Sequence, residues 1–390
     1  MLFLHLHYQL FLPNLYWVFL EELRLHMLIL QFQQSLRAVV LAALLFFCIN
    51  PIIAGIDAFD ERCLWVVRNT MTNEQAIDEM IEFADVNGFN NLLVQVRGRG
   101  DAYYNSQLVP RSELLRDSAF DPLAYVLKKA HERGLTVHAW VNVYFIWASE
   151  KPPHALHHLY NRHPNWIDTN GNNDESSYND ENEKMGEGYF LAPHHPEVQK
   201  HLLAVFRELT ALYDLDGLHL DYIRFHDTEY GNNEYAKSYY NKNIITLDWN
   251  NYRRAAITNL VKETKKMLMD VRPDCKLSAA VKPNLLLAKN RFFQEWDMWL
   301  AAGYLDWAIP MNYTPNLRDF AGNIGIMYEN LPRKYRQKIM MGIALYNQPP
   351  LDAIDKINYS EITRFRGISI FSYNVFKENA GYSRDLLRTQ

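Results

Sequence analysis

From Arg62 onward, short apolar segments alternate with longer stretches in which apolar residues recur at helical spacing. Thr72 and Gln75 form a capping box at the start of one such stretch, and Gly88 follows its end. The apolar residues of this predicted helix are Ile77, Met80, Ile81 and Ala84. Asp121 caps the next predicted helix, which has a proline at its first position. Both helices lie between apolar segments, so strands and helices alternate along the chain.

Eight of the short apolar segments are predicted to be strands. They lie near residues 64–68, 91–97, 136–144, 217–223, 276–282, 306–312, 339–346 and 367–373. Long helices predicted over 196–213 and 248–269 fill two of the gaps. A repeated strand–helix unit of this kind is typical of the α/β class and of a closed (β/α)8 barrel of the TIM type. An open doubly wound sheet is the alternative, but residues 69–72 lack the glycine-rich phosphate turn expected after its first strand.

Polar residues recur at every second position near the carboxyl ends of the predicted strands. Alternate side chains of a strand point to opposite faces, so Leu218, Leu220 and Tyr222 are predicted to face the helices. His219 and Asp221 then face the barrel axis. The same alternation directs these other residues inward: Gln95, Arg97, His138, Trp140, Asn142, Tyr144, Ser278, Lys282, Asn312, Tyr346 and Tyr373. Because barrel interiors are usually apolar, we predict an active site, with satisfied buried polar groups as the alternative at single positions.

Asp221 is the predicted catalytic carboxylate. Asn142 and Lys282 lie on the neighbouring strands, and a nearby ammonium favours the ionised form of a carboxyl group. An ionised Asp221 suits a nucleophile, a base or a stabiliser of a cationic transition state, as in glycoside hydrolysis, which also needs a protonated acid. The candidates for this second carboxyl are Asp101, Glu113, Glu150, Asp227 and Glu229. Each of them would equally fit a surface charge.

The composition is that of a folded globular protein and favours a carbohydrate ligand. With 48% hydrophobic and 22% charged residues the chain can bury a large core, and its net charge of −5 offers no positive field for nucleic acid. Aromatic residues reach 14%, with 24 Tyr and 9 Trp, and aromatic rings are good platforms for sugars. The three cysteines lack the spacing of a zinc site, and Cys63 and Cys275 are predicted to be free thiols.

Residues 1–58 differ from the rest and are predicted to be a signal peptide or an amino-terminal anchor. Arg37 precedes an apolar run over residues 38–49, which is short for a membrane span. Met27 lies just before this region and is an alternative start of translation. Residues 59–390 are predicted to form a single barrel that is periplasmic, secreted or attached to the envelope. Membrane contact is expected only through a retained amino-terminal segment.

Five motifs occur in order along the predicted barrel. They are VQVRGRGDAYY at 94–104, FDPL at 120–123, VHAWVN at 137–142, DGLHLDYIRF at 216–225 and IPMNY at 309–313. Together they resemble the glycosyl hydrolase-like family 10 proteins. The resemblance implies a TIM-type barrel, a secreted or envelope location in bacteria, and hydrolysis of a polysaccharide, with cell-wall (peptidoglycan) glycan the favoured substrate. By the same match, Asp221 takes the family's acid on strand four and Asp101 its acid on strand two.

We therefore expect Asp221, Asp101 and Glu113 to supply the catalytic carboxyl groups. The expected substrate-binding residues are Arg97, His138, Trp140, Asn142, Tyr144, His219, Tyr222, Arg224, Lys282, Asn312, Tyr313, Tyr346 and Tyr373. No metal or cofactor is expected. A chitinase-like mechanism on strand four is excluded, because His219 and Ile223 replace acids of that motif.

Two other functions stay open, a barrel that binds glycan without cleaving it and a metal-dependent polysaccharide deacetylase. The first would explain why no obvious acid pair is present. Against the second, the histidines at 154, 157, 158, 194 and 195 lack the helical His-x-x-x-His spacing, so solvated or helix-start histidines are favoured. The long acidic loop predicted at 149–188 fits a flap over the substrate, a solvated insertion or a calcium site.

Overall fold

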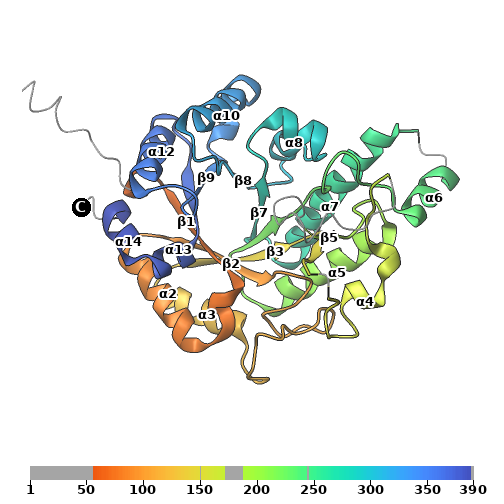
Figure 1. Ribbon diagram of the computed structural model, residues 1–390, viewed down its shortest axis with the longest axis horizontal. Coiled ribbons are helices and arrows are strands. Elements are labelled where there is room, and N and C mark those ends of the chain that lie inside the picture. The colour runs from red at the N-terminus through yellow and green to blue at the C-terminus, as the bar shows by residue number, and fades with distance from the viewer. Residues whose placement is uncertain (1–55, 150, 172–187, 244–245, 388–390) are drawn as a thin grey trace, which may run out of the picture. The chain divides into compact units, whose positions relative to one another are not determined.

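A computed structural model describes residues 56–149, 151–171, 188–243 and 246–387. Within these ranges eight parallel strands form one sheet in the order β8–β7–β6–β3–β2–β1–β10–β9. Their bounds are β1 (Glu61–Val66), β2 (Asn91–Arg97), β3 (Thr136–Asn142), β6 (Gly217–Asp221), β7 (Lys276–Val281), β8 (Trp307–Pro310), β9 (Met340–Ala344) and β10 (Gly367–Phe371). Parallel bridges from Ala308 to Ile339 and from Met311 to Gly342 join β8 to β9 and close the barrel (Figure 1). The predicted (β/α)8 barrel is confirmed.

Helices follow the strands and surround the barrel (Figure 1). Those outside the barrel are α2 (Glu74–Val86), α3 (Pro122–His131), α5 (Pro196–Leu212), α7 (Trp249–Val271), α8 (Leu285–Arg291), α9 (Trp296–Ala301), α10 (Leu317–Asn330), α11 (Arg333–Arg336), α12 (Pro350–Ile362), α13 (Tyr373–Glu378) and α14 (Ala380–Leu387). Further elements in the connections are the 3-10 helices η1 (Ile56–Ala58), η2 (Arg68–Thr72) and η3 (Pro164–Trp166), the helices α4 (Leu159–Arg162) and α6 (Glu234–Lys242), and the antiparallel pair β4 (Phe145–Trp147) and β5 (Tyr189–Phe190).

The helix starts follow from side-chain caps. Helix α3 begins where predicted, because the Asp121 carboxylate accepts an amide of its first turn at 3.1 Å. Helix α2 begins one residue later than predicted, since Asn73 accepts the Ala76 amide at 2.9 Å. The Thr72 hydroxyl instead donates to the carbonyl of Asn69 at 3.1 Å and closes η2. The predicted capping box is therefore wrong by one residue.

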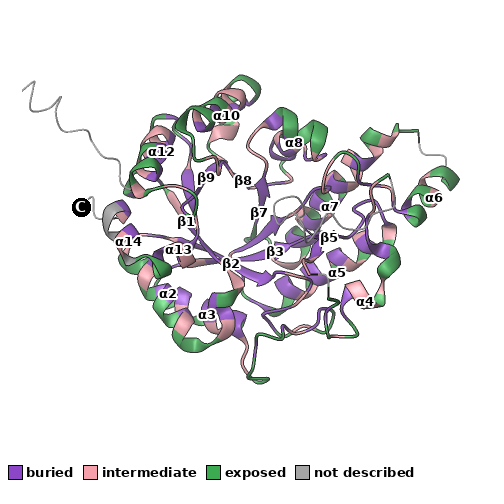
Figure 2. Cartoon of the chain, viewed as in Figure 1, coloured by how far each residue is buried: buried purple, intermediate pink, exposed green. Residues whose placement is uncertain are grey.

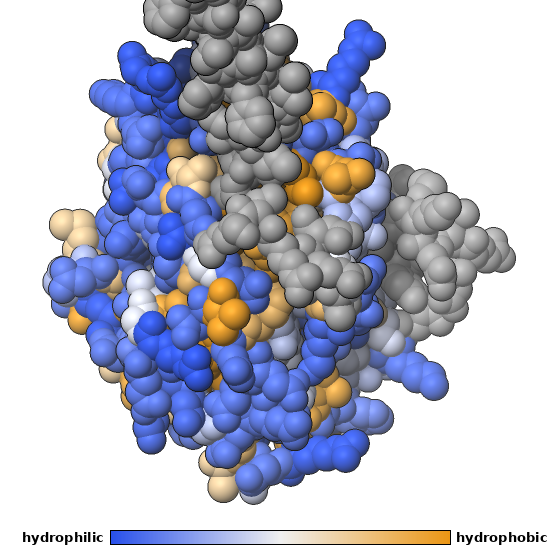
Figure 3. Space-filling view, turned by 90° about the vertical axis from the view of Figure 1, so that its left-hand side faces the viewer, coloured by the Kyte–Doolittle hydropathy of each residue, from blue (hydrophilic) through white to orange (hydrophobic). Residues whose placement is uncertain are grey.

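Apolar side chains fill the space on both sides of the sheet. The strands are mostly buried, whereas the longer outer helices are buried on one side and exposed on the other (Figure 2). The outer face seen in Figure 3 is mostly hydrophilic, with separate hydrophobic spots. Residues packed inside the barrel include Trp65, Leu93, Trp140, Trp307 and Ile309. A larger core lies between the strands and the helices.

Both described cysteines are free thiols, as predicted. Cys63 belongs to the cluster inside the barrel, and Cys275 belongs to the core between strands and helices. Burial raises the pKa of Cys275 to about 12, so this thiol is unreactive near neutral pH. Cys48 lies outside the described residues.

The described barrel begins slightly before the predicted boundary at residue 59. Ile56 in η1 and the following Phe59 are both buried in the core between strands and helices. Residues 1–55 lie outside the described residues, so the signal peptide or anchor stays a prediction. No helix of the described part has the length and apolar character needed to cross a membrane.

The predicted long loop after the third strand is partly ordered into α4, η3 and β5. Positions 150 and 172–187 lie outside the described residues, so the flap and calcium-site predictions stay predictions. Asp168 lies at the base of this loop and is buried. Its backbone amide donates to Phe190 at 2.8 Å, and the Asn233 amide group donates to the carbonyl of Ile167 at 2.8 Å. The loops after β3 and β6 are thereby tied together.

Replacing Asp168 with Asn is expected to stabilise the protein most at pH 8, less at pH 5 and little below about pH 4. Burial raises the pKa of Asp168 to about 7, and the charge of Arg253 acts in the opposite direction. The unfolded carboxyl titrates near 4, so this residue's contribution to stability is highest below about pH 4 and falls as the pH rises to about 7. Calorimetry of both proteins in the same buffers measures this effect, because the histidines titrate in both proteins and only the difference in stability belongs to Asp168. A variant less stable than the wild type at pH 8 would show instead that the ionised carboxylate stabilises the fold through Arg253.

Candidate active site

A cavity of about 570 Å³ opens at the carboxyl ends of the barrel strands. We call it the central cavity. Its lining residues lie in or just after all eight strands: Trp65, Val67, Arg68, Gln95, Arg99, Trp140, Asn142, Phe145, Asp221, Tyr222, Arg224, Lys282, Met311, Tyr313, Tyr346 and Phe371. Its volume and its aromatic walls suit one or more sugar rings.

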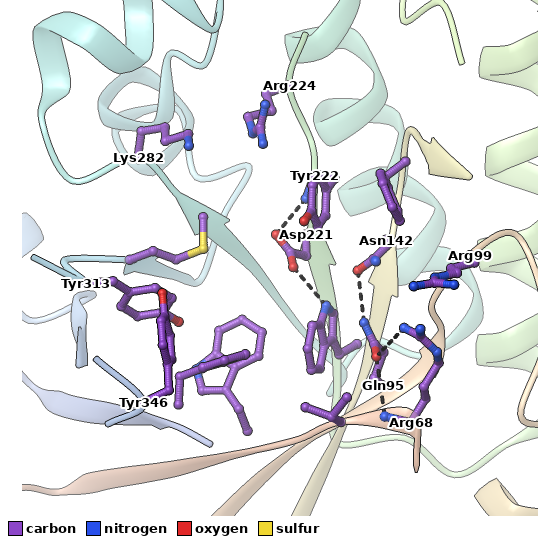
Figure 4. Close-up of a pocket in the computed structure, with 16 residues that line it drawn as sticks. Arg68, Gln95, Arg99, Asn142, Asp221, Tyr222, Arg224, Lys282, Tyr313 and Tyr346 are labelled. Carbon is purple, nitrogen blue, oxygen red and sulfur yellow. Dashed lines mark hydrogen bonds between the residues drawn. The ribbon is translucent and has the colours of Figure 1, made fainter. Parts of the chain in front are cut away.

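Asp221 lies near the middle of the central cavity, at the end of β6 (Figure 4). Its side chain is buried and accepts two hydrogen bonds: Oδ2 from the indole N–H of Trp140 at 3.1 Å, and Oδ1 from the backbone amide of Tyr222 at 2.7 Å. Two N–H donors aimed at one carboxylate fix its orientation and stabilise its negative charge. Lys282 lines the same cavity, as predicted.

Asn142 does not contact Asp221 in the way that the sequence predicts. Its side-chain amide donates to the carbonyl of Gly98 at 2.7 Å and accepts from the side-chain amide of Gln95 at 3.4 Å. Trp140, two residues earlier on β3, takes the place beside Asp221. Asn142 therefore organises the end of β2, while Trp140 holds the carboxylate.

Tyr222 faces the cavity, although simple alternation directs it to the helices. The strand ends at Asp221, and Tyr222 has φ of 51°, in the left-handed region. This turn places its ring in a stack with Phe145, with ring centroids 4.8 Å apart. The Arg224 guanidinium lies 5.2 Å from the centre of the Tyr222 ring. The extended alternation stops where the strand stops, so it fails for this residue.

Seven of the expected substrate-binding residues line the central cavity together with Asp221. They are Trp140, Asn142, Tyr222, Arg224, Lys282, Tyr313 and Tyr346. The other six, Arg97, His138, Tyr144, His219, Asn312 and Tyr373, do not reach it.

Two of the six are buried deeper in the barrel. His219 shares a hydrogen bond of 2.8 Å with the hydroxyl of Ser278. His138 stacks on a tryptophan near the amino ends of the strands, and burial lowers the pKa of His138 to about 4. Both point inward as predicted, but they are structural groups below the cavity floor.

The inward direction predicted for Arg97 is wrong. The register of β2 and β3 shifts between Gln95 and Arg97, so that Arg97 pairs with Val141, a residue of the core between strands and helices. The guanidinium of Arg97 is fully buried and donates to the carbonyls of Asn142 and Val143.

The other three residues make structural contacts outside the cavity. Tyr144 accepts a hydrogen bond of 3.2 Å from Gln199, and Asn312 donates to the carbonyl of Phe320 at 3.0 Å. Tyr373 is the first residue of α13 and packs against Phe83 of α2 at 5.4 Å. Strand β10 ends at Phe371, so the alternation that directs Tyr373 inward does not reach it.

Several cavity residues were not among the expected binding residues. They are Trp65, Val67, Arg68, Gln95, Arg99, Phe145, Met311 and Phe371. Alternation already directs Gln95 inward, and the same rule applied to β1 and β10 finds Trp65 and Phe371. Apolar side chains look like core residues, so a search for polar ones overlooks them. Arg68 and Arg99 lie just beyond the ends of their strands, where the alternation of side chains no longer applies.

Asp101 and Glu113 line a separate cavity of about 200 Å³, which we call the adjacent cavity. Arg68 and Arg99 line both cavities. Asp101 accepts a hydrogen bond of 2.8 Å from the backbone amide of Arg99, and Glu113 is exposed. The structure therefore does not bring the two predicted acids into the cavity of Asp221.

The remaining candidate acids have other positions. Asp227 forms an ion pair with the Arg291 guanidinium, with Nε and Oδ1 2.9 Å apart. Glu229 is exposed, and Glu150 lies outside the described residues. Asp227 is therefore a surface partner of an arginine.

The histidines of the loops have structural roles in the described region. His158 and His195 are the N-caps of α4 and α5, and each accepts an amide N–H at 3.2 Å. His194 is buried among aromatic rings, with Phe225 at 5.5 Å. The predicted helix-start role is confirmed for His158 and His195. Among the described residues no group of three His, Cys, Asp or Glu side chains is arranged to hold a metal ion.

The Tyr313 hydroxyl is buried and has no hydrogen-bond partner among the described residues. Burial and the nearby Asp221 charge raise the pKa of Tyr313 well above its usual value, so this group is a hydrogen-bond donor and not a proton source. A buried hydroxyl without a partner costs free energy, so a ligand in the cavity is a natural acceptor for it.

Replacing Tyr313 with Phe is expected to lower kcat/KM about 10-fold while leaving the melting temperature unchanged or raised. The hydrogen bond that this variant loses forms only when substrate is bound, so activity falls. In the free protein the buried hydroxyl has no partner and lowers stability, so its removal does not destabilise the fold. The matched control is Tyr144→Phe, which removes a hydroxyl that is bonded to Gln199 outside the cavity. That variant should lose stability and keep activity. A Tyr313→Phe variant with full activity would remove this hydroxyl from substrate binding.

The barrel and its aromatic cavity around one carboxylate define this chain as a (β/α)8-barrel protein with a site of saccharide size. The chain belongs to the glycosyl hydrolase-like 10 family, which matches residues 59–357.

Known proteins of the same kind are similar along most of the barrel. Glycosyl hydrolase DigH of Escherichia coli (strain K12) is 24% identical over 307 residues, which cover 70% of this chain and 66% of that protein. Glycosyl hydrolase YngK of Bacillus subtilis (strain 168) is 24% identical over 280 residues, which cover 64% of this chain and 51% of that protein. The chain thus spans just under two thirds of the first relative and about half of the second.

Solved structures share the fold. The PgaB (BpsB) glycoside hydrolase domain from Bordetella bronchiseptica superposes with a TM-score of 0.62 at 12% identity, over 85% of this chain and 99% of that domain. Alpha-L-fucosidase isoenzyme 2 from Paenibacillus thiaminolyticus has a TM-score of 0.51 at 15% identity, over 74% of this chain and 40% of that protein. These similarities agree with the barrel described above.

Proposed function

We propose that this chain is a glycoside hydrolase that cleaves a polysaccharide, with bacterial cell-wall glycan as its substrate. The observation that carries the proposal is Asp221, a buried carboxylate at the centre of a cavity walled by aromatic rings and fixed by two N–H donors. Membership of the glycosyl hydrolase-like 10 family supports the same reaction class. The glycan-binding alternative does not explain why a carboxylate is buried at this point, because burial of a charge is costly and a binding surface does not require it.

Asp221 acts on the anomeric carbon of the sugar in the central cavity. An oxocarbenium-like transition state develops positive charge there, and a fixed carboxylate stabilises it or attacks it. The indole of Trp140 and the amide of Tyr222 keep the carboxylate in place, so little reorganisation is needed during the reaction. Trp65, Tyr222 and Phe371 supply ring faces for the sugar.

The proton donor to the leaving group is assigned to the adjacent cavity. Asp221 is the only carboxyl group among the described residues that line the central cavity. Asp101 and Glu113 line the neighbouring one, and the two cavities meet at Arg68 and Arg99. A glycan that runs from one cavity into the other therefore places its scissile bond between the two kinds of carboxyl group. Asp101 is already used by the Arg99 amide and lies near the Arg97 charge, so Glu113 is the preferred donor.

The cell-wall substrate and the location belong to the same proposal. Relatives of this chain are named glycosyl hydrolases from bacteria, and the apolar segment before the barrel suits export to the periplasm, the envelope or the medium. A glycan of the cell wall is the substrate that such an enzyme would meet.

The proposal is tested by incubating the folded protein with peptidoglycan, peptide-stripped glycan strands, chitin and neutral polysaccharides, followed by mass analysis of the products. Release of fragments from the stripped strands is the expected result. Binding to the strands without fragments would favour the non-catalytic barrel. Loss of acetyl groups that depends on added metal would favour the deacetylase.

A further inference from the structure

Arg97 is a fully buried cation that forms no ion pair. Its exposed fraction is 0%, and none of the ion pairs in the described part of the chain includes it. Its Nη1 atom donates to the carbonyls of Asn142 and Val143, the second at 3.3 Å. Its Nε and Nη2 atoms have no hydrogen-bond partner among the described residues. Burial of a charge is costly unless an opposite charge compensates for it, so this guanidinium calls for a further partner.

The two unpaired nitrogen atoms form one edge of the planar guanidinium group. Nε–H and one N–H of Nη2 point in the same direction, and this arrangement holds an anion through two parallel hydrogen bonds. The third nitrogen, Nη1, is already used by the backbone at the end of β3. A water molecule would accept these hydrogen bonds but would bring no negative charge. The unpaired edge therefore fits an anion better than a neutral molecule.

Asp101 does not supply the opposite charge. Burial lowers the pKa of Arg97, and the attraction of Asp101 only partly offsets this effect. The Asp101 carboxylate lines the adjacent cavity and accepts the backbone amide of Arg99 at 2.8 Å. It acts on Arg97 from a distance and leaves the unpaired edge of the guanidinium without an acceptor.

The loop after β2 provides a further hydrogen-bond donor close to Arg97. Arg97 forms an antiparallel bridge with Ala102, whose small side chain takes up little space beside the guanidinium. The Tyr104 hydroxyl is buried and has no hydrogen-bond partner among the described residues, because the nearby Ser106 donates to Glu208 instead. Burial raises the pKa of Tyr104 and the charge of Arg97 acts in the opposite direction, so this hydroxyl stays protonated and lies within reach of the guanidinium.

Helix α5 covers the same region from outside. Tyr213 at its end has its ring 5.9 Å from that of Tyr104, and the Tyr213 hydroxyl accepts the backbone amide of Asn105 at 2.9 Å. His201 of α5 has a buried Nε2 atom without a partner among the described residues. Burial lowers the pKa of His201 to about 4, and the charge of Arg97 acts in the same direction, so the ring is neutral at pH 7 and can offer an N–H. Arg97, Tyr104 and His201 can thus all donate, and an anion is the acceptor that suits such a set.

We propose that the unpaired edge of Arg97 binds a small monovalent anion, chloride first of all, between the loop after β2 and helix α5, with Tyr104 as a third donor. The site is separate from the central cavity, which Arg97 does not line, and it does not depend on the proposed hydrolysis. The anion neutralises the guanidinium, whose Nη1 holds the carbonyls of Asn142 and Val143 at the end of β3. Since Asn142 pairs with Asp221 in the register of β3 and β6, the anion supports the strand ends beneath the central cavity.

Bromide tests the site directly, because it replaces chloride in anion sites and its anomalous scattering identifies it in a crystal. Crystals of the full chain grown in sodium bromide are expected to show an anomalous peak in hydrogen-bond contact with Nε and Nη2 of Arg97. A water molecule at this edge, with no anomalous signal in bromide, would overturn the proposal.

Thermal unfolding measures the same binding in solution. When chloride replaces gluconate at constant ionic strength, the melting temperature is expected to rise by about 3 °C or more and then to saturate. Arg97→Lys keeps the charge but lacks the planar edge, so its melting temperature should no longer respond to chloride. Tyr104→Phe leaves the guanidinium intact and should weaken chloride binding about 5- to 10-fold. Should Arg97→Lys fail to fold, Tyr104→Phe decides the matter.

The matched control is Tyr103→Phe. It removes the buried hydroxyl of the preceding residue, which lies near Asp101 and Arg68, and it should keep the chloride response of the wild type. An equal rise of the melting temperature in the wild type, Tyr104→Phe and Arg97→Lys would show a general salt effect and would reject the site. Neither measurement uses a glycan, so a failure of the proposed hydrolase leaves this test unchanged.

Discussion

Replacing Asp221 with Asn is expected to lower polysaccharide turnover by about 100- to 1,000-fold or more, because the charge that stabilises the transition state is removed. The melting temperature should change little. The Asn oxygen still accepts one of the two N–H groups, from Trp140 or Tyr222, and the cost of a buried charge disappears. Turnover and thermal unfolding are measured on the same preparation.

The matched control for this experiment is Asp227→Asn, which removes a carboxylate from the connection after the same strand. Asp227 is paired with Arg291 at the surface, so this variant should keep its turnover. A folded Asp221→Asn protein that keeps full activity, with a lowered melting temperature, would make Asp221 a structural partner of the cavity cations and not part of the mechanism.

Replacing Glu113 with Gln is expected to lower activity on the natural glycan by at least about 100-fold, the usual contribution of a general acid. The effect should nearly vanish on a dinitrophenyl glycoside of the same sugar, because that leaving group departs without a proton. Asp221→Asn should lose activity on both substrates. The comparison of kcat/KM on the two substrates for each variant therefore separates the two carboxyl roles.

Asp101→Asn is the matched comparison, since Asp101 lines the same adjacent cavity. It is expected to lower activity on both substrates to a similar, smaller extent, by loosening the backbone of Arg99. If the dependence on the leaving group follows Asp101 and not Glu113, the proton donor is Asp101. If it follows neither, the proton comes from outside the adjacent cavity.

The fold could be predicted because its signals are local. Each strand is a short apolar run and each helix has its own apolar face, as in the helix after Asp121, whose cap and first-turn proline are next to each other in the sequence. Errors remain at the ends of helices and strands, where a single hydrogen bond decides which residue begins or ends the element. Thr72 and Asn73 are both suitable caps, and only the turn before them selects Asn73.

The site could be predicted only where side chains belong to extended strands. Trp140, Asn142 and Asp221 point inward because the alternation of a strand continues up to their positions. Beyond the last strand residue the rule fails, and the errors are of two opposite kinds. Tyr222 turns into the cavity through its left-handed backbone, and Tyr373 leaves it as the first residue of a helix.

A barrel with Asp221 facing its axis follows from the order of residues alone, because burial and alternation are properties of neighbouring residues. The surroundings of that carboxylate depend on how distant segments pack together. This packing placed Asp101 and Glu113 in the adjacent cavity and brought Arg68 and Arg99, from the connections after β1 and β2, to the junction of the two cavities. The paths of loops depend on contacts between distant segments, such as those of Arg68 with Gln95 and of Arg99 with His158, and no periodicity in the chain encodes them.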